Sequence, residues 1–137
     1  MGKLVLVLLV ALAGCSTQTS TSSGPGTAPI SGAETVTVVL SSFSFDPDHI
    51  RLRAGKPVRL KLVNESDGGH NFSAPAFFAA SSFPPGSSAP VDGTMEVGSR
   101  QTVEVALVPR EPGTYPLKCT HPLHALFGMT GAIEVTP

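Results

Sequence analysis

Four side chains that bind soft or borderline metal ions stand in two segments of this 137-residue chain. Cys119, His124 and Met129 follow one another near the C-terminus with the spacing C-x4-H-x4-M, and His70 stands alone upstream in the segment GGHNF. A thiolate, two imidazoles and a thioether are the ligand set of a blue-copper site, in which the Cys and His ligands are roughly trigonal and Met is a weak axial ligand. Because this set suits both Cu(I) and Cu(II), the residues predict a mononuclear copper site for one-electron transfer.

Alternating apolar and polar residues predict the strands that must position these ligands. The alternation is clearest in the segment VRLKL at 58–62, and it recurs in the runs 36–40, 43–45, 50–53, 103–107 and 133–135. Turn residues separate the runs, and 14 Gly and 13 Pro favour a turn-rich all-β chain over a helical bundle. We therefore expect an all-β sandwich or barrel over residues 34–137.

Residues 74–93 interrupt this alternation. No stretch of the chain carries a convincing helical period, so we expect these residues to form a long, partly apolar loop. A loop of this length is more often functional than idle.

The N-terminal residues resemble an export signal with a lipid-attachment site. Residues 1–14 carry one Lys, ten apolar residues and then small residues, which is too short to span a bilayer. The segment LAGC resembles a bacterial lipobox, whose Cys, here Cys15, is lipidated after cleavage. The Ser-, Thr-, Gly- and Pro-rich residues 15–33 then predict a flexible linker. We expect an exported protein at the cell envelope, in the periplasm or on the outer face of a membrane, anchored through Cys15.

Composition excludes two classes of partner. Only 14% of residues are charged and the formal net charge is −1, which argues against a nucleic-acid-binding surface and against a polybasic membrane patch. Contact with the membrane is therefore expected through the lipid anchor only.

The cysteine count also bears on the site. If Cys15 is lipidated, Cys119 has no disulfide partner, and metal ligation accounts for a free thiol in an exported protein.

Residues 34–137 resemble the cupredoxin family, which includes plastocyanin, azurin and auracyanin. The pieces that carry the resemblance are FSFDP at 43–47, IRLRAGKPV at 50–58, Asn64 before HNF at 70–72, GTY at 113–115 before the C-x4-H-x4-M run, and the closing GAIEV at 131–135. The resemblance implies a Greek-key β-sandwich or barrel of the cupredoxin type. It also implies one type 1 copper ion bound by His70, Cys119, His124 and Met129.

The resemblance assigns roles to two further residues and leaves a third open. Asn71 is expected to tie the upstream ligand segment to Thr120, the residue after the Cys, and so to restrain the ligands. The family often has Pro-Gly before the second His, where this chain has Pro-Leu. His121 is an extra imidazole that could be a bystander, an alternative copper ligand or a pH-sensitive group.

The neighbours of Cys119 favour an electron carrier over an enzyme. Multicopper oxidases have His on both sides of this Cys, and copper nitrite reductases have a ligand His directly after it, whereas here the neighbours are Lys118 and Thr120. We expect a monomer that exchanges single electrons with a redox protein such as a cytochrome or an oxidase. A copper carrier or buffer at the envelope is the alternative, and a metal-free adhesion-type sandwich is a third.

An apolar surface is expected around His124, where a redox partner would dock. Several of its residues come from the segment 119–129 that carries Cys119, His124 and Met129, which we call the ligand loop. They are Pro122, Leu123, Leu126 and Phe127, together with Ala125. Pro75, Phe77, Phe78 and Phe83 from the 74–93 segment are candidates to extend it. A small, weakly charged patch suits brief redox encounters.

Overall fold

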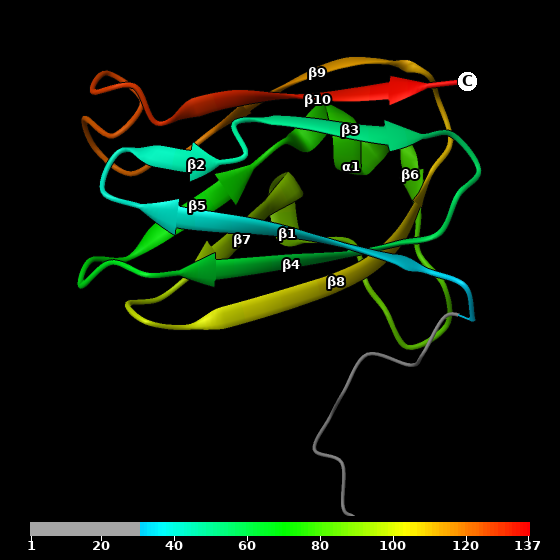
Figure 1. Ribbon diagram of the computed structural model, residues 1–137, viewed down its shortest axis with the longest axis horizontal. Helices are drawn as coiled ribbons and strands as arrows, with labels where there is room; N and C mark the ends of the chain where they lie inside the picture. Colours follow the sequence, from blue (N-terminus) through cyan, green and yellow to red (C-terminus); the bar gives the residue numbers. More distant parts are fainter. Residues whose placement is uncertain (1–30) are drawn as a thin grey trace, which may run out of the picture.

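The alternating segments form two five-stranded sheets that pack face to face as a β-sandwich (Figure 1). The computed structural model describes residues 31–137. One sheet has the order β2-β1-β4-β8-β6, and the other has the order β3-β10-β9-β5-β7. The strands are β1 (Glu34–Ser41), β2 (Ser44–Asp46), β3 (His49–Arg53), β4 (Val58–Asn64), β5 (His70–Ser73), β6 (Ser81–Ser82), β7 (Thr94–Val97), β8 (Thr102–Pro109), β9 (Gly113–Lys118) and β10 (Thr130–Thr136).

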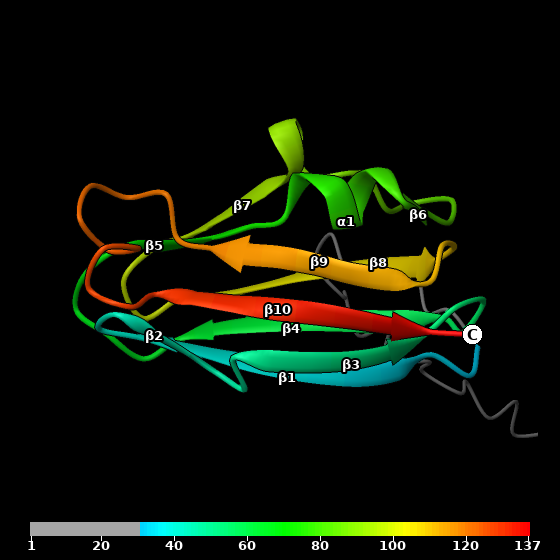
Figure 2. The same ribbon diagram turned by 90° about the horizontal axis from the view of Figure 1, so that it is seen from above.

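Strand β4 shows why the alternation produces this fold. Its apolar residues Val58, Leu60 and Leu62 are buried between the sheets, while Arg59 and Lys61 point outward and contact Glu104 of β8. Strand β1 pairs with β4 in parallel and β3 pairs with β10 in parallel, whereas the other pairings are antiparallel. Seen from above, the sheet that contains β3, β10 and β9 lies over the sheet that contains β1, β4 and β8 (Figure 2). The buried apolar residues of both sheets form one core. The expected all-β sandwich is confirmed.

The segment 74–93 is more ordered than the expected loop. It contains a short helix α1 (Pro75–Ala79), strand β6 and a 3-10 turn η1 (Val91–Gly93). Phe77 and Phe78 of α1 are 1% and 3% exposed, so these two candidates do not extend a docking surface. Their rings pack into the core beside Phe72 and Tyr115, because a one-turn helix can bury two consecutive aromatic residues at the edge of a sandwich. Phe83 also packs against the core and is half-buried.

The predictions for the signal peptide 1–14, for Cys15 and for most of the 15–33 linker lie outside the described residues. Within residues 31–137, no helix is long and apolar enough to cross a membrane. Strand β1 begins at Glu34.

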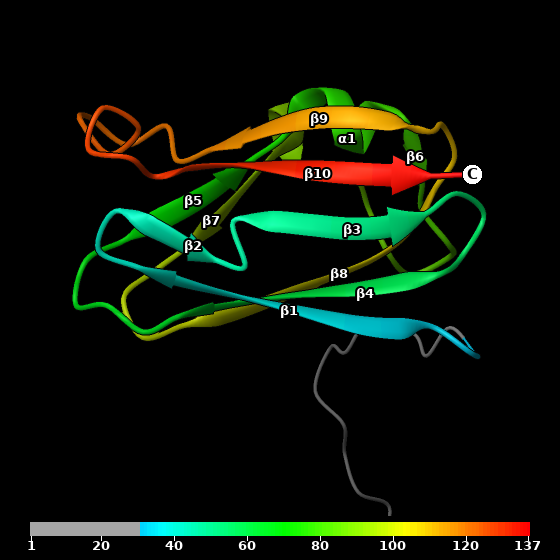
Figure 3. The ribbon, with the colours of Figure 1, turned by 45° about the horizontal axis from the view of Figure 1, so that its top comes forward.

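One end of the sandwich gathers the segments that matter for the candidate site (Figure 3). At this end lie the β1–β2 turn, the β4–β5 loop, the start of β5 and the 119–129 loop between β9 and β10. Asn64 fixes the β4–β5 loop there, because its Nδ2 lies 2.8–3.0 Å from the carbonyl oxygens of Gly68, Val97 and Gly98. Its Oδ1 accepts hydrogen bonds from the N–H and hydroxyl of Ser66. A buried amide with this many partners orders the chain directly before His70.

We expect Asn64→Ala to lower the free energy of unfolding by about 3 kcal/mol, because it leaves buried carbonyl oxygens without a donor. Urea denaturation followed by circular dichroism would measure the change. Ser66→Ala is the matched control, since it removes a hydroxyl at the rim of the same network and should cost less than about 1 kcal/mol. Equal costs for the two variants would show that the buried amide does not organise this loop.

Candidate metal centre

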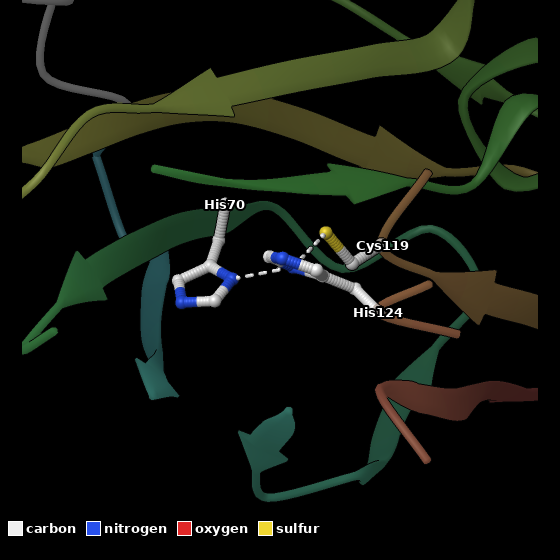
Figure 4. Close-up of side chains that lie close together, drawn as sticks. All are labelled: His70, Cys119 and His124. Atoms are coloured by element: carbon white, nitrogen blue, oxygen red, sulfur yellow. Dashed lines mark hydrogen bonds between the residues drawn. The ribbon is translucent and has the colours of Figure 1, made fainter. Parts of the chain in front are cut away.

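His70, Cys119 and His124 converge at this end of the sandwich (Figure 4). One ligand atom from each residue lies within 4.8 Å of the others. The Nδ1 atom of His124 is 3.1 Å from Nδ1 of His70 and 3.4 Å from Sγ of Cys119. Donor atoms that share one metal at bond lengths of about 2.0–2.3 Å and at angles of roughly 100–120° lie about 3.1–4.0 Å apart, so these spacings fit a single small ion.

The three residues come from elements of different rigidity. His70 is the first residue of β5 and Cys119 directly follows β9, so the sheet positions both. Their exposed fractions are 3% and 0%. His124 is on the 119–129 loop and is half-buried. It is therefore the member of the cluster through which the site meets solvent.

Burial keeps the His70 ring in the form that binds metals. Desolvation lowers the pKa of His70, and the nearby rings of His124 and His121 lower it further. The imidazole is therefore neutral at pH 7, as a ligand nitrogen must be. Its Nε2 is buried without a hydrogen-bond partner among residues 31–137, while its Nδ1 faces the other two donors. Nδ1 is thus the atom that could hold a metal.

Asn71 joins the two ligand segments. Its side-chain oxygen accepts a hydrogen bond from the Thr120 N–H at 2.8 Å, and its Nδ2 donates to the Thr120 hydroxyl at 2.8 Å. Its backbone N–H points at Sγ of Cys119 at 3.5 Å, which stabilises a thiolate. The structure thus brings together the pair that the sequence analysis singled out, at the position where it can restrain the sulfur.

Glu96 is a member of this network that the sequence analysis missed. It accepts a hydrogen bond from Asn71 Nδ2 at 2.8 Å, and its other oxygen lies 3.0 Å from Nε2 of His121. Burial raises the pKa of Glu96, but the hydrogen bonds from Asn71 and His121 and the charge of His121 outweigh it and lower the pKa. The contact arises because Asn71 pairs with Glu96 across β5 and β7. The sequence alone does not reveal this register.

Met129 is the last residue of the ligand loop, directly before β10. It is fully buried, its carbonyl accepts a hydrogen bond from the Cys119 N–H at 3.0 Å, and its N–H donates to the His124 carbonyl at 2.9 Å. The backbone therefore links all three residues of the C-x4-H-x4-M run. Coordination by the Met129 sulfur stays a prediction.

The apolar residues of the ligand loop lie on the surface. Pro122 is exposed, and Leu123, Leu126 and Phe127 are 61%, 79% and 60% exposed. Leu123 has a φ of +69°, a left-handed conformation that favours Gly. Phe43 of the β1–β2 turn joins these side chains, and sequence reasoning had not placed it there.

Comparisons with known proteins agree with this fold. The sequence matches the family described as cupredoxin-like domain over residues 4–133. The structure is similar to a dithionite-reduced auracyanin from the photosynthetic bacterium Roseiflexus castenholzii, with 20% identity, a TM-score of 0.59, and coverage of 77% of this chain and 100% of the auracyanin. It is also similar to auracyanin B, with 25% identity, a TM-score of 0.59, and coverage of 83% and 96%.

A third similar structure is the multicopper oxidase McoA from the hyperthermophile Aquifex aeolicus. The identity is 16% and the TM-score is 0.61, and the match covers 82% of this chain but only 32% of the oxidase. At this identity the likeness concerns the fold alone. No curated protein matches the sequence significantly.

We expect Asn71→Ala to lower the free energy of unfolding of the metal-free chain by about 2–3 kcal/mol, because it unpairs the Thr120 N–H in a half-buried site. It should also weaken Cu(II) binding by roughly tenfold or more, the usual cost of losing a residue that orients metal ligands. Chemical denaturation and competition with a chelator measure the two effects. Thr120→Ala is the matched control, since it keeps the backbone bond and loses only the hydroxyl; an equal loss in both variants would contradict the bridging role.

Proposed function

This chain belongs to the cupredoxin-like family, and on that premise we propose that it is a mononuclear type 1 copper protein that carries single electrons. The observation that carries the proposal is the convergence of His70, Cys119 and His124 on one point, with Met129 buried and hydrogen-bonded through its backbone to Cys119 and His124. Copper bound there would supply a one-electron couple between Cu(I) and Cu(II). We place His70, Cys119 and His124 as its strong ligands and Met129 as its axial ligand.

The residues around the cluster suit this role because they resist movement. Cys119 and His70 are held by the ends of two neighbouring strands and by the Asn71 bridge. The His124 and Met129 backbones are bonded to each other and, through Met129, to Cys119. A ligand set that keeps its geometry when the charge on the metal changes lowers the reorganisation that accompanies each electron transfer.

The neighbours of Cys119 support a carrier rather than an oxidase. Lys118 and Thr120 occupy the positions where multicopper oxidases have the His residues that bind a second copper cluster. The chain also corresponds to about a third of the oxidase chain that it resembles.

We further propose that electrons enter and leave through His124, because it is the half-buried ligand.

We expect Cu(II) to give the reduced metal-free chain an intense blue or green absorption band, because a thiolate ligand transfers charge to Cu(II). The protein to use is the full chain with Cys15→Ser, so that Cys119 is the one remaining thiol. The band should disappear on addition of ascorbate and should be absent from a Cys119→Ser variant. Visible spectroscopy and then potentiometry measure these properties.

Two other results would overturn the proposal in different ways. A colourless protein that still binds Cu(I) would favour a copper carrier or buffer. A chain that binds neither ion would contradict copper binding at this cluster altogether.

For the redox partner we propose a protein, such as a cytochrome or an oxidase, that docks on the apolar surface around His124. Leu123, Leu126 and Phe127 are exposed there. Contacts of this kind are small and short-lived, which suits a carrier that must release its partner after each electron. We further propose that the chain acts as a monomer held at the membrane by a lipid on Cys15, which lies outside the described residues.

We expect Leu126→Asp to slow electron exchange with such a partner by roughly tenfold, because a charge in an apolar contact must be desolvated when the partner binds. The absorption band should not change, because Leu126 is 79% exposed and lies outside the ligand cluster. Stopped-flow kinetics with a cytochrome measures the rate. Val91→Asp, at an 81% exposed apolar residue in η1, is the matched control. Equal rates for the two variants and the unmodified chain would exclude this surface.

A further inference from the structure

Phe43 has a backbone conformation that an aromatic residue rarely adopts. It is the second of two residues in the turn between β1 and β2, where Ser41 pairs with Ser44 and their hydroxyls are 2.8 Å apart. Its φ is +67°, in the left-handed region where turns favour Gly or Asn. A bulky residue with positive φ is an outlier, and such outliers persist where the side chain has a role that offsets the strain.

Core packing does not account for Phe43. Its side chain is 41% exposed and is absent from the group of residues that form the core between the sheets. Its ring instead contacts two residues of the ligand loop. It meets the His124 ring at 90° with a centroid distance of 5.2 Å, and it meets the Phe127 ring at a centroid distance of 5.2 Å.

His124 is the ligand candidate that most needs such a support. It sits on a loop, whereas His70 and Cys119 are held by the sheet. Among residues 31–137, the hydrogen-bond contacts of the His124 ring both run through Nδ1 to His70 and Cys119. An ion bound at Nδ1 would use the atom that makes those contacts. The orientation of the ring then depends on packing, and an edge-to-face aromatic contact fixes a ring plane.

We propose that Phe43 is a positioning residue for His124, and that its ring fixes the imidazole in the orientation that directs Nδ1 at His70 and Cys119. The left-handed backbone of the β1–β2 turn places the ring at the open side of the cluster. The effect on copper rests on the proposed function, whereas the effect on the His124 ring exists in the metal-free chain.

The test compares variants that remove the ring without straining the turn. Phe43→Gly and Phe43→Asn both suit a positive φ, and Phe43→Tyr keeps an aromatic ring. Asp92→Gly is the matched control, because Asp92 is also a non-glycine residue with positive φ, in η1 away from the cluster. All four are made in the full chain with Cys15→Ser. Urea denaturation identifies any variant that is not folded.

In the metal-free chain, carbon-13 relaxation of the His124 ring should show a clear loss of order in Phe43→Gly and Phe43→Asn. Phe43→Tyr and Asp92→Gly should keep the order of the unmodified chain. With Cu(II) bound, release to a chelator should be about two- to tenfold faster in the ring-free variants, the range that an aromatic pair of this kind supplies. Their copper hyperfine splitting in electron paramagnetic resonance should also change.

Unchanged ring order and unchanged copper release in Phe43→Gly and Phe43→Asn would overturn the proposal, as would an equal effect in Asp92→Gly. If the unmodified chain binds no copper, the proposed function fails, but the ring relaxation of the metal-free chain still decides the role of Phe43. The two failures are therefore distinguishable.

Discussion

The side chain of Asn71 bridges strands β5 and β9 where their backbone ladder ends, and the candidate site depends on this bridge. The two strands are neighbours in the sheet, yet they share a single residue pair, Ser73 with Lys118. Beyond that pair the strands separate, and the Asn71 amide bonds both the N–H and the hydroxyl of Thr120. The gap leaves room for the sulfur of Cys119, which lies 3.5 Å from the Asn71 N–H. At the candidate site, side-chain hydrogen bonds thus take the place of the backbone hydrogen bonds that would otherwise join β5 and β9.

The same arrangement divides the cluster into a fixed half and an accessible half. His70 and Cys119 stand on the sheet and are shielded from water, as a thiolate that must not oxidise requires. His124 stands on the loop and remains half-buried, so it is the member of the cluster through which the proposed electron transfer would reach a partner at the surface. The backbone hydrogen bonds of Met129 join the ligand loop to Cys119 and limit how far His124 can move from His70 and Cys119. A single ligand could not easily be both rigidly held and open to the surface. Here His70 and Cys119 are held by the sheet, and His124 is the one near the surface.

The sequence predicts the parts of this design that repeat or that carry distinctive chemistry. Period-two alternation in segments such as 58–62 predicts the sandwich, and the Cys and His of the C-x4-H-x4-M run with an upstream His are the three side chains that converge. It does not predict contacts set by register or by local backbone shape. Glu96 joins the Asn71 network only because β5 and β7 pair Asn71 with Glu96. Helix α1 is a single turn, too short for a period, so the burial of Phe77 and Phe78 was not predictable from spacing.

Backbone strain is concentrated at the accessible end in a way that has a physical reason. Four non-glycine residues among 31–137 have positive φ, and the two apolar ones, Phe43 and Leu123, both lie beside His124. Each conformation costs about 1–2 kcal/mol relative to the right-handed form, and each residue also leaves apolar surface in water. Neither cost is offset in the core, because both side chains are more than a third exposed. Two unfavourable choices of the same kind beside the one half-buried ligand candidate support the proposal that this end of the molecule serves contact around His124, at some expense of stability.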